Sequence, residues 1–124
     1  MTPMPPNASP PGEQELAARF RAILERTRCD PDGALDDTIA SLITMHDGFD
    51  ALFTDETALT ILESPQLGSI YAFSAAVQKT VQPGHPAQRR RTPDQRTEQL
   101  RTQLPRFRDR LQRLLEELDE AYPR

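Results

Sequence analysis

The chain has 124 residues, with 15 basic and 19 acidic side chains and a formal net charge of −4. This length suits one small domain with tails, and no apolar run approaches the roughly 20 residues that a membrane-spanning helix needs. One cysteine and two histidines exclude a disulfide framework and a Cys/His zinc module. The first residues carry no signal-peptide pattern, which together with the single cysteine predicts a cytoplasmic protein.

The first two thirds of the chain predict a tail followed by a helical domain. Residues 1–12 contain five prolines and are expected to be disordered. Apolar side chains then recur at helical spacings of three and four, and no stretch alternates as a strand would. The first helix is expected over 13–29, and Asp30 with Pro31 is expected to cap and start a second one. We therefore assign residues 13–82 to one helical domain.

Two further helices are predicted in the second half of this domain. Gly48 either ends the second helix or bends it. Thr54 is a candidate N-cap for a short third helix. The inward side chains of that helix are expected to be Leu59, Ile61 and Leu62. Ser64, followed by proline, starts a fourth helix in the same way.

A linker and one long helix complete the prediction. Residues 83–92 are rich in proline and arginine and are interpreted as a linker. Thr92 and Gln95 form a capping box for a last helix over 93–121, which Pro105 is expected to kink or split. The predicted fold class is therefore all-α, a small helical bundle of about five helices with a long C-terminal helix that contains a proline.

The last helix carries a strict heptad pattern, which we call the seam. Its apolar side chains repeat at spacings of four and three. The members of the seam are Leu100, Leu104, Phe107, Leu111, Leu114 and Leu118. A single helix with such a stripe is only marginally stable in water, so the seam must be covered by another helix. The cover is either the rest of this chain or a second copy.

The charges beside the seam indicate how two copies would pair. In a parallel pair, Arg96 of one helix would face Arg101 of the other and repel it. An antiparallel pair sets the arginine-rich first half of the helix against its acidic second half. If the chain forms a homo-oligomer through its last helix, we expect the antiparallel arrangement.

The two halves of the chain carry opposite charge. From residue 29 to 78 there are nine acidic residues and no lysine or arginine, whereas nine arginines and three acids occupy 86–113. The acidic set proposed as a binding face is Asp36, Asp37, Asp47, Asp50, Asp55 and Glu56. The arginines that could contact phosphates are Arg89, Arg90, Arg91, Arg96 and Arg101. These arginines could bind nucleic acid, pair with the acidic half or meet a protein partner.

No motif indicates catalysis or a cofactor. The chain has fourteen arginines and one lysine, which is typical of a protein from a GC-rich bacterial or phage genome. Cys29 has Arg26 and Arg28 nearby, which would lower its pKa, while the end of a helix would raise it. His46 lies on an apolar face and is interpreted as a boundary histidine. We therefore expect a non-enzymatic protein–protein interaction module, without cofactor or metal, that acts as adaptor, assembly factor or inhibitor. The alternative is a small protein that binds nucleic acid through its arginines.

Overall fold

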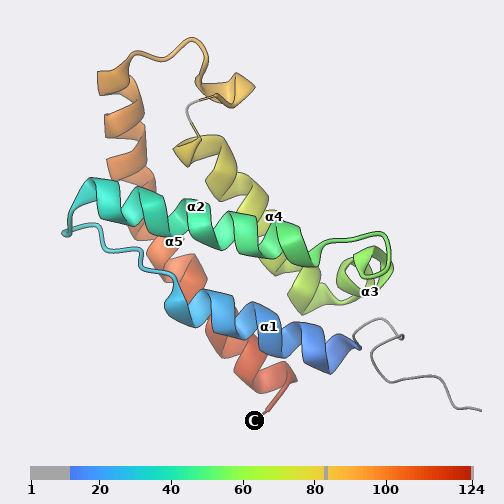
Figure 1. Ribbon diagram of the computed structural model, residues 1–124. Helices are drawn as coiled ribbons and strands as arrows, with labels where there is room; N and C mark the ends of the chain where they lie inside the picture. The colour runs from blue at the N-terminus through green and yellow to red at the C-terminus, as the bar shows by residue number, and fades with distance from the viewer. Residues whose placement is uncertain (1–11, 83, 124) are drawn as a thin grey trace, which may run out of the picture.

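In the computed structural model, residues 12–82 and 84–123 are described, and within them the chain forms only helices, turns and loops. The α-helices are α1 (Glu13–Arg26), α2 (Leu35–Leu52), α3 (Ala58–Glu63), α4 (Pro65–Val81) and α5 (Pro93–Ala121) (Figure 1). A short 3-10 helix, η2 (Pro86–Gln88), lies between α4 and α5. The predicted all-α class is confirmed. Of the predicted tail, only residue 12 is among those described.

The connection between α1 and α2 is longer than predicted. α1 ends at Arg26, and α2 begins only at Leu35. The reason is local: the Asp30 carboxylate accepts the backbone N–H of Asp32 at 3.0 Å, so Asp30 closes a turn of its own. The expectation that α2 starts at Pro31 is therefore wrong.

The helix α2 runs through its glycine without ending there. Gly48 is helical, and the side chain of Ile23 from α1 lies 3.2 Å from where a Cβ on Gly48 would be. Of the two outcomes predicted for Gly48, the structure shows continuation as far as Leu52. A residue without a side chain at this position lets α1 approach α2 closely.

A serine or threonine stands at the N-cap of α3, α4 and α5, and its hydroxyl caps the helix in α4 and α5. The hydroxyl of Thr57, not that of Thr54, occupies the start of α3 and donates to the carbonyl of Leu52. Ser64 caps α4 as predicted, since its hydroxyl accepts from the backbone N–H of Leu67. The predicted capping box of Thr92 and Gln95 is present at the start of α5.

Helix α5 is continuous across its internal proline. Pro105 lies in the middle of the 29 residues of α5, and the helix does not split there.

Gln88, in the predicted linker, is buried, and its amide donates to the carbonyl of Lys79 at 2.7 Å. The end of α4 therefore holds the segment between α4 and α5.

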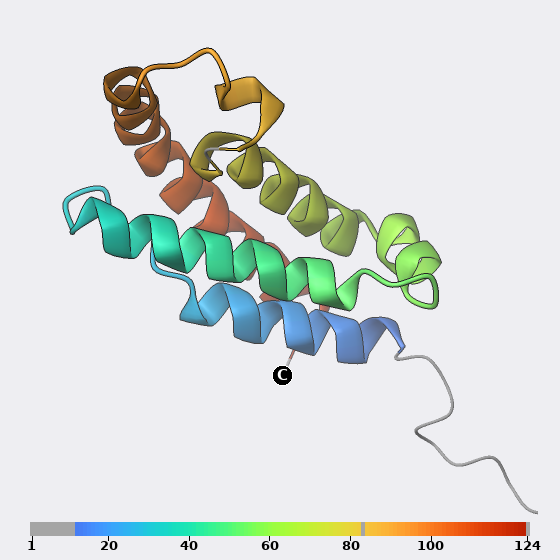
Figure 2. The same ribbon diagram turned by 45° about the horizontal axis from the view of Figure 1, so that its top comes forward.

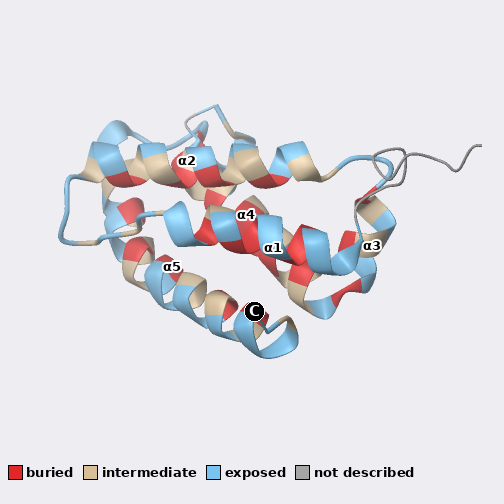
Figure 3. Ribbon diagram, turned by 60° about the horizontal axis from the view of Figure 1, so that its bottom comes forward, coloured by how far each residue is buried: buried red, intermediate tan, exposed pale blue. Residues whose placement is uncertain are grey.

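The helices pack into one bundle with a shared core. α1 and α2 lie side by side, and α4 and α5 cross behind them (Figures 1 and 2). The buried faces of the helices turn toward each other, and the exposed faces turn outward (Figure 3). Phe20 of α1 contacts Phe49 of α2 at 5.0 Å between ring centroids, and Phe73 of α4 meets Phe107 of α5 edge-on at 6.0 Å. The core therefore spans the domain and the last helix together.

A buried arginine ties α1 to the end of α5. The Nη2 of Arg21 donates to the carbonyls of Leu118 and Tyr122 at 3.1 and 2.6 Å. Its Nε lies 3.0 Å from a carboxylate oxygen of Asp119, an ion pair that lacks hydrogen-bond alignment. The hydroxyl of Tyr122 contacts both Glu13 and Ser64. These contacts hold the two ends of the described chain together.

Candidate interaction surfaces

The seam belongs to the core of the chain. Five of its six members are buried, with Leu114 and Leu118 no more than 1% exposed, and Leu111 is half-buried. They contact the apolar faces of the other helices in one continuous cluster. The sequence allowed either this chain or a second copy to cover the seam, and the structure shows that this chain covers it. The seam is therefore not available as the site of an antiparallel pair.

The predicted acidic face is exposed but divided. Asp36, Asp47 and Asp50 share one stripe of α2, because their spacing keeps them within a third of the helix circumference. Asp37 lies on another side of that helix. The last two members, Asp55 and Glu56, follow in the turn before α3. Among the residues that the structure describes, no arginine or lysine lies within 4.0 Å of any of these carboxylates.

The predicted arginine cluster is unpaired among the described residues, and four of its five members are exposed. Arg89, Arg90 and Arg91 follow η2, and Arg101 lies on the outer face of α5. Arg96 is half-buried and turns toward the bundle. In the described part of the chain none of the five forms an ion pair, so the charges of the two halves do not neutralise each other by direct contact.

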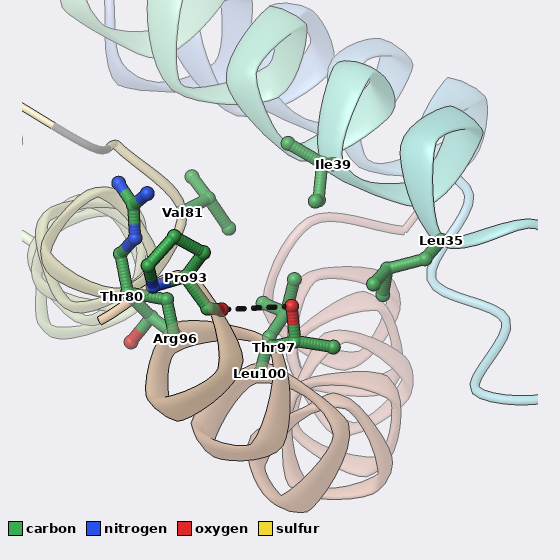
Figure 4. A pocket seen from close by; sticks show the side chains of 8 residues that line it. All are labelled: Leu35, Ile39, Thr80, Val81, Pro93, Arg96, Thr97 and Leu100. Atoms are coloured by element: carbon green, nitrogen blue, oxygen red, sulfur yellow. Dashed lines mark hydrogen bonds between the residues drawn. The ribbon is translucent and has the colours of Figure 1, made fainter. Parts of the chain in front are cut away.

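A small apolar pocket lies where α2 and α5 begin and α4 ends. Its volume is about 220 Å³. Leu35 and Ile39 of α2 face Thr97 and Leu100 of α5 across it (Figure 4). The Thr97 hydroxyl already donates to the carbonyl of Pro93 at 3.0 Å. The pocket lining contains no acid, histidine or cysteine, so the pocket can accept an apolar group but offers no acid–base pair for catalysis.

Residues with reactive side chains lie apart from this pocket. Burial raises the pKa of Cys29 from 9.0 to about 11, and the positive charge of Arg108 only partly opposes that shift. The expectation that Arg26 and Arg28 lower this pKa is therefore wrong. The Nδ1 of His46 is 2.9 Å from the hydroxyl of Ser74, as suits a boundary histidine. No group of metal ligands occurs in 12–82 or 84–123.

A surface on α3 was not predicted from the sequence. Leu59 and Leu62 are 67% and 63% exposed, and no other large apolar side chain of the described residues is comparably exposed. The expectation that both face inward is wrong, since only Ile61 does. The spacing contained the signal: residues three apart share a helix face, whereas Ile61 is two residues from Leu59 and lies on another.

Exposed acids flank these two leucines along the chain. Asp55 and Glu56 lie in the turn before α3, and Glu63 ends the helix. No cation of the described chain lies within 4.0 Å of these three carboxylates. We call this surface the α3 patch, defined by Asp55, Glu56, Leu59, Leu62 and Glu63. It combines an apolar centre with an acidic rim, as protein-binding surfaces do.

Comparison with family models, with curated proteins and with solved structures finds no match for this chain. In the described residues, no helix is long and apolar enough to cross a membrane. The function must therefore be inferred from the residues and their placement.

Proposed function

We propose that this chain is a non-enzymatic protein–protein interaction module that binds a basic protein surface through the α3 patch. It would act as an adaptor, assembly factor or inhibitor. The supporting observation is the exposure of Leu59 and Leu62, about two thirds each, inside a rim of unpaired acids. The cytoplasmic location and the bacterial or phage source stay predictions from composition.

The leucines would supply most of the binding free energy. Full burial of a leucine is worth about 1.5–3 kcal/mol, and both are mostly uncovered in the chain alone. A small chain could place either side chain in its core, as it does with Ile61. Two exposed leucines on one helix face therefore favour a partner that covers them.

The acidic rim indicates the charge of that partner. The rim lies within a stretch from residue 29 to 78 that contains nine acids and no lysine or arginine. The three unpaired carboxylates give the α3 patch a negative charge, which speeds association with a positive surface and disfavours acidic competitors. A partner that presents apolar side chains between arginines or lysines fits both parts of the patch.

Site-specific crosslinking tests the proposed function. The photoreactive residue p-benzoylphenylalanine replaces Leu59 in the full chain, which is expressed in its source cells and irradiated. We expect a covalent adduct with a protein. The matched control carries the same residue in place of Ala87, an exposed position in η2, and should give no such adduct.

Three outcomes of this experiment are decisive. A protein adduct at position 59 that the control lacks supports the interaction module. An adduct with nucleic acid alone contradicts it and favours the alternative function. The absence of any adduct at position 59, in cells where the chain is present, overturns the proposal.

One observation favours nucleic-acid binding as a second candidate function. Arg89, Arg90, Arg91 and Arg101 are exposed and unpaired within the described chain, so their charges are available to phosphates. The test is retention of labelled duplex DNA and single-stranded RNA at low and raised salt. We expect replacement of Arg89, Arg90 and Arg91 by Gln to abolish retention, whereas Arg26→Gln with Arg28→Gln does not. No retention at low salt ends this alternative.

A further inference from the structure

A second surface of the chain is complementary to the α3 patch. It is a groove of about 520 Å³ between α4 and α5. Its α4 wall consists of the small side chains of Ser69, Ala72 and Ala76, with the edges of Phe73 and Phe107 at its base. Small side chains on the wall allow another helix to approach closely.

Two arginines of α5 line the other side of this groove. Arg106 and Arg110 are one helical turn apart and therefore lie on the same face of α5. Neither has a carboxylate within 4.0 Å among the residues that the structure describes. The groove therefore combines an apolar floor with positive charge, the reverse of the α3 patch.

The spacings on the two surfaces also agree. Leu59 and Leu62 are neighbours on one face of α3, with side chains about 5–6 Å apart, and Arg106 and Arg110 are separated by a similar distance along α5. Two leucines lying over Ala72 and Ala76 would bring the acidic rim of α3 beside both arginines. The apolar and ionic contacts could thus form together.

We propose that the α4/α5 groove binds the α3 patch of a second copy of this chain. This proposal rests on the proposed function and specifies its partner. Because patch and groove are different surfaces, the contact is heterologous. It closes into a dimer if two copies can engage reciprocally, and it otherwise propagates into a ring or an open chain.

Measurement of mass against concentration tests self-association. The full chain is examined by sedimentation equilibrium from micromolar to millimolar concentration. We expect the mean mass to rise above that of one chain with concentration, and the association to weaken at raised salt because the ion pairs are screened. A single chain mass at every concentration overturns the proposal.

Variants of the two surfaces locate the contact. We expect Leu59→Ser with Leu62→Ser, and separately Arg106→Glu with Arg110→Glu, to weaken association at least about tenfold. Leu59, Leu62 and Arg106 are exposed and Arg110 is half-buried, so the fold should persist, as far-ultraviolet circular dichroism will show. The matched control is Arg90→Glu with Arg101→Glu, which makes the same charge change outside the groove and should weaken association much less.

Charge reversal shows whether the two surfaces meet each other. Asp55→Arg with Glu63→Arg makes the patch basic, and Arg106→Glu with Arg110→Glu makes the groove acidic. Each variant alone should repel its own copies. A mixture should associate again, because each patch then meets a groove of opposite charge. Failure of the mixture to associate, while both variants are folded, contradicts contact between patch and groove.

Comparison with the crosslinking experiment separates this proposal from the function on which it rests. If the purified chain is monomeric but position 59 crosslinks to a different protein, the interaction module stands and self-association is wrong. If position 59 crosslinks only to residues 1–11 of its own chain or to nucleic acid, both proposals fail. An adduct between two copies supports both.

Discussion

Arg21 is the side chain that joins the ends of the fold. It is 8% exposed, and its guanidinium donates to two carbonyls at the end of α5. The macrodipole places negative partial charge at the carbonyls of the last helical turn. The Leu118 carbonyl already accepts from the backbone N–H of Tyr122 at 2.8 Å, and Arg21 adds a second, charged donor to it. The buried guanidinium of Arg21 therefore stabilises this end of α5 by charge and by hydrogen bonds. Its role depends on two segments about a hundred residues apart.

We predict that Arg21→Met destabilises the chain by about 1–3 kcal/mol, because the buried carbonyls lose charged donors. Urea unfolding followed by circular dichroism measures the free energy of unfolding. The matched control is Arg19→Met, which removes only an exposed pair with Glu15 and should cost less than about 0.5 kcal/mol. Equal losses for both variants would contradict the capping role.

Cys29 is predicted to react slowly in the folded chain. Its pKa of about 11, against 9.0 without burial, leaves about a hundredfold fewer thiolates at pH 8. Alkylation by iodoacetamide, followed by mass spectrometry, should therefore accelerate when the chain is unfolded in urea. Since the folded pKa is the higher one, this group favours the folded state below pH 9 and loses that effect as pH rises toward 11.

The cation that acts on Cys29 can be identified by substitution. Arg108→Ala should slow alkylation further, because its charge lowers the pKa of the thiol. Arg26→Ala should leave the rate unchanged, although Arg26 is closer in sequence. The opposite pattern would show that sequence neighbours, not the packing of α5, set this pKa.

At the scale of elements, α5 shows how a heptad pattern can serve a single chain. Its apolar stripe resembles that of a coiled coil, but α1 and α4 cover it. The same periodicity suits any helix that packs against others at a shallow angle, so the spacing alone does not distinguish the two. The half-buried Leu111 marks where the cover is thinnest.

We predict that Leu114→Ala costs about 2–5 kcal/mol, because it leaves a cavity in the core. Leu111→Ala, the matched control on the same stripe, should cost clearly less. Thermal and urea unfolding measure both. The midpoint of each variant should not depend on protein concentration, since the seam is covered within the chain. A midpoint that rises with concentration would show that a second copy covers the seam.

At the scale of the whole molecule, opposite charges are separated rather than paired. Among the described residues, no ion pair joins an acid of 30–63 to an arginine of 89–113. Exposed charges that form no direct ion pair are screened by physiological salt and add little to stability. The segregated charges are therefore available for binding.

We predict that Asp36→Asn with Asp50→Asn changes the free energy of unfolding by less than about 0.5 kcal/mol. A network of salt bridges between the two halves would instead make this pair clearly destabilising. Unfolding of the original chain and of the variant at low and raised salt tests the same prediction. The free energy of unfolding of each should depend only weakly on salt. A large loss in the variant at low salt would contradict the separation of charges.

Helix positions were largely predictable because they depend on local chemistry. Apolar periodicity located α1, α2, α4 and α5, and the caps at Ser64 and Thr92 followed from short motifs. Errors arose where a local alternative competed. Asp30 closes a turn of its own, and the hydroxyl of Thr57 rather than that of Thr54 stands at the start of α3. Such competition is decided by only a few hydrogen bonds.

The sequence by itself determined the helical class, most of the helix ends and the division of charge along the chain. Tertiary structure alone decided that the seam faces inward, that Leu59 and Leu62 face outward and that the thiol of Cys29 has a raised pKa. The physical reason is that helix formation depends on neighbours in sequence, whereas burial depends on which distant faces meet.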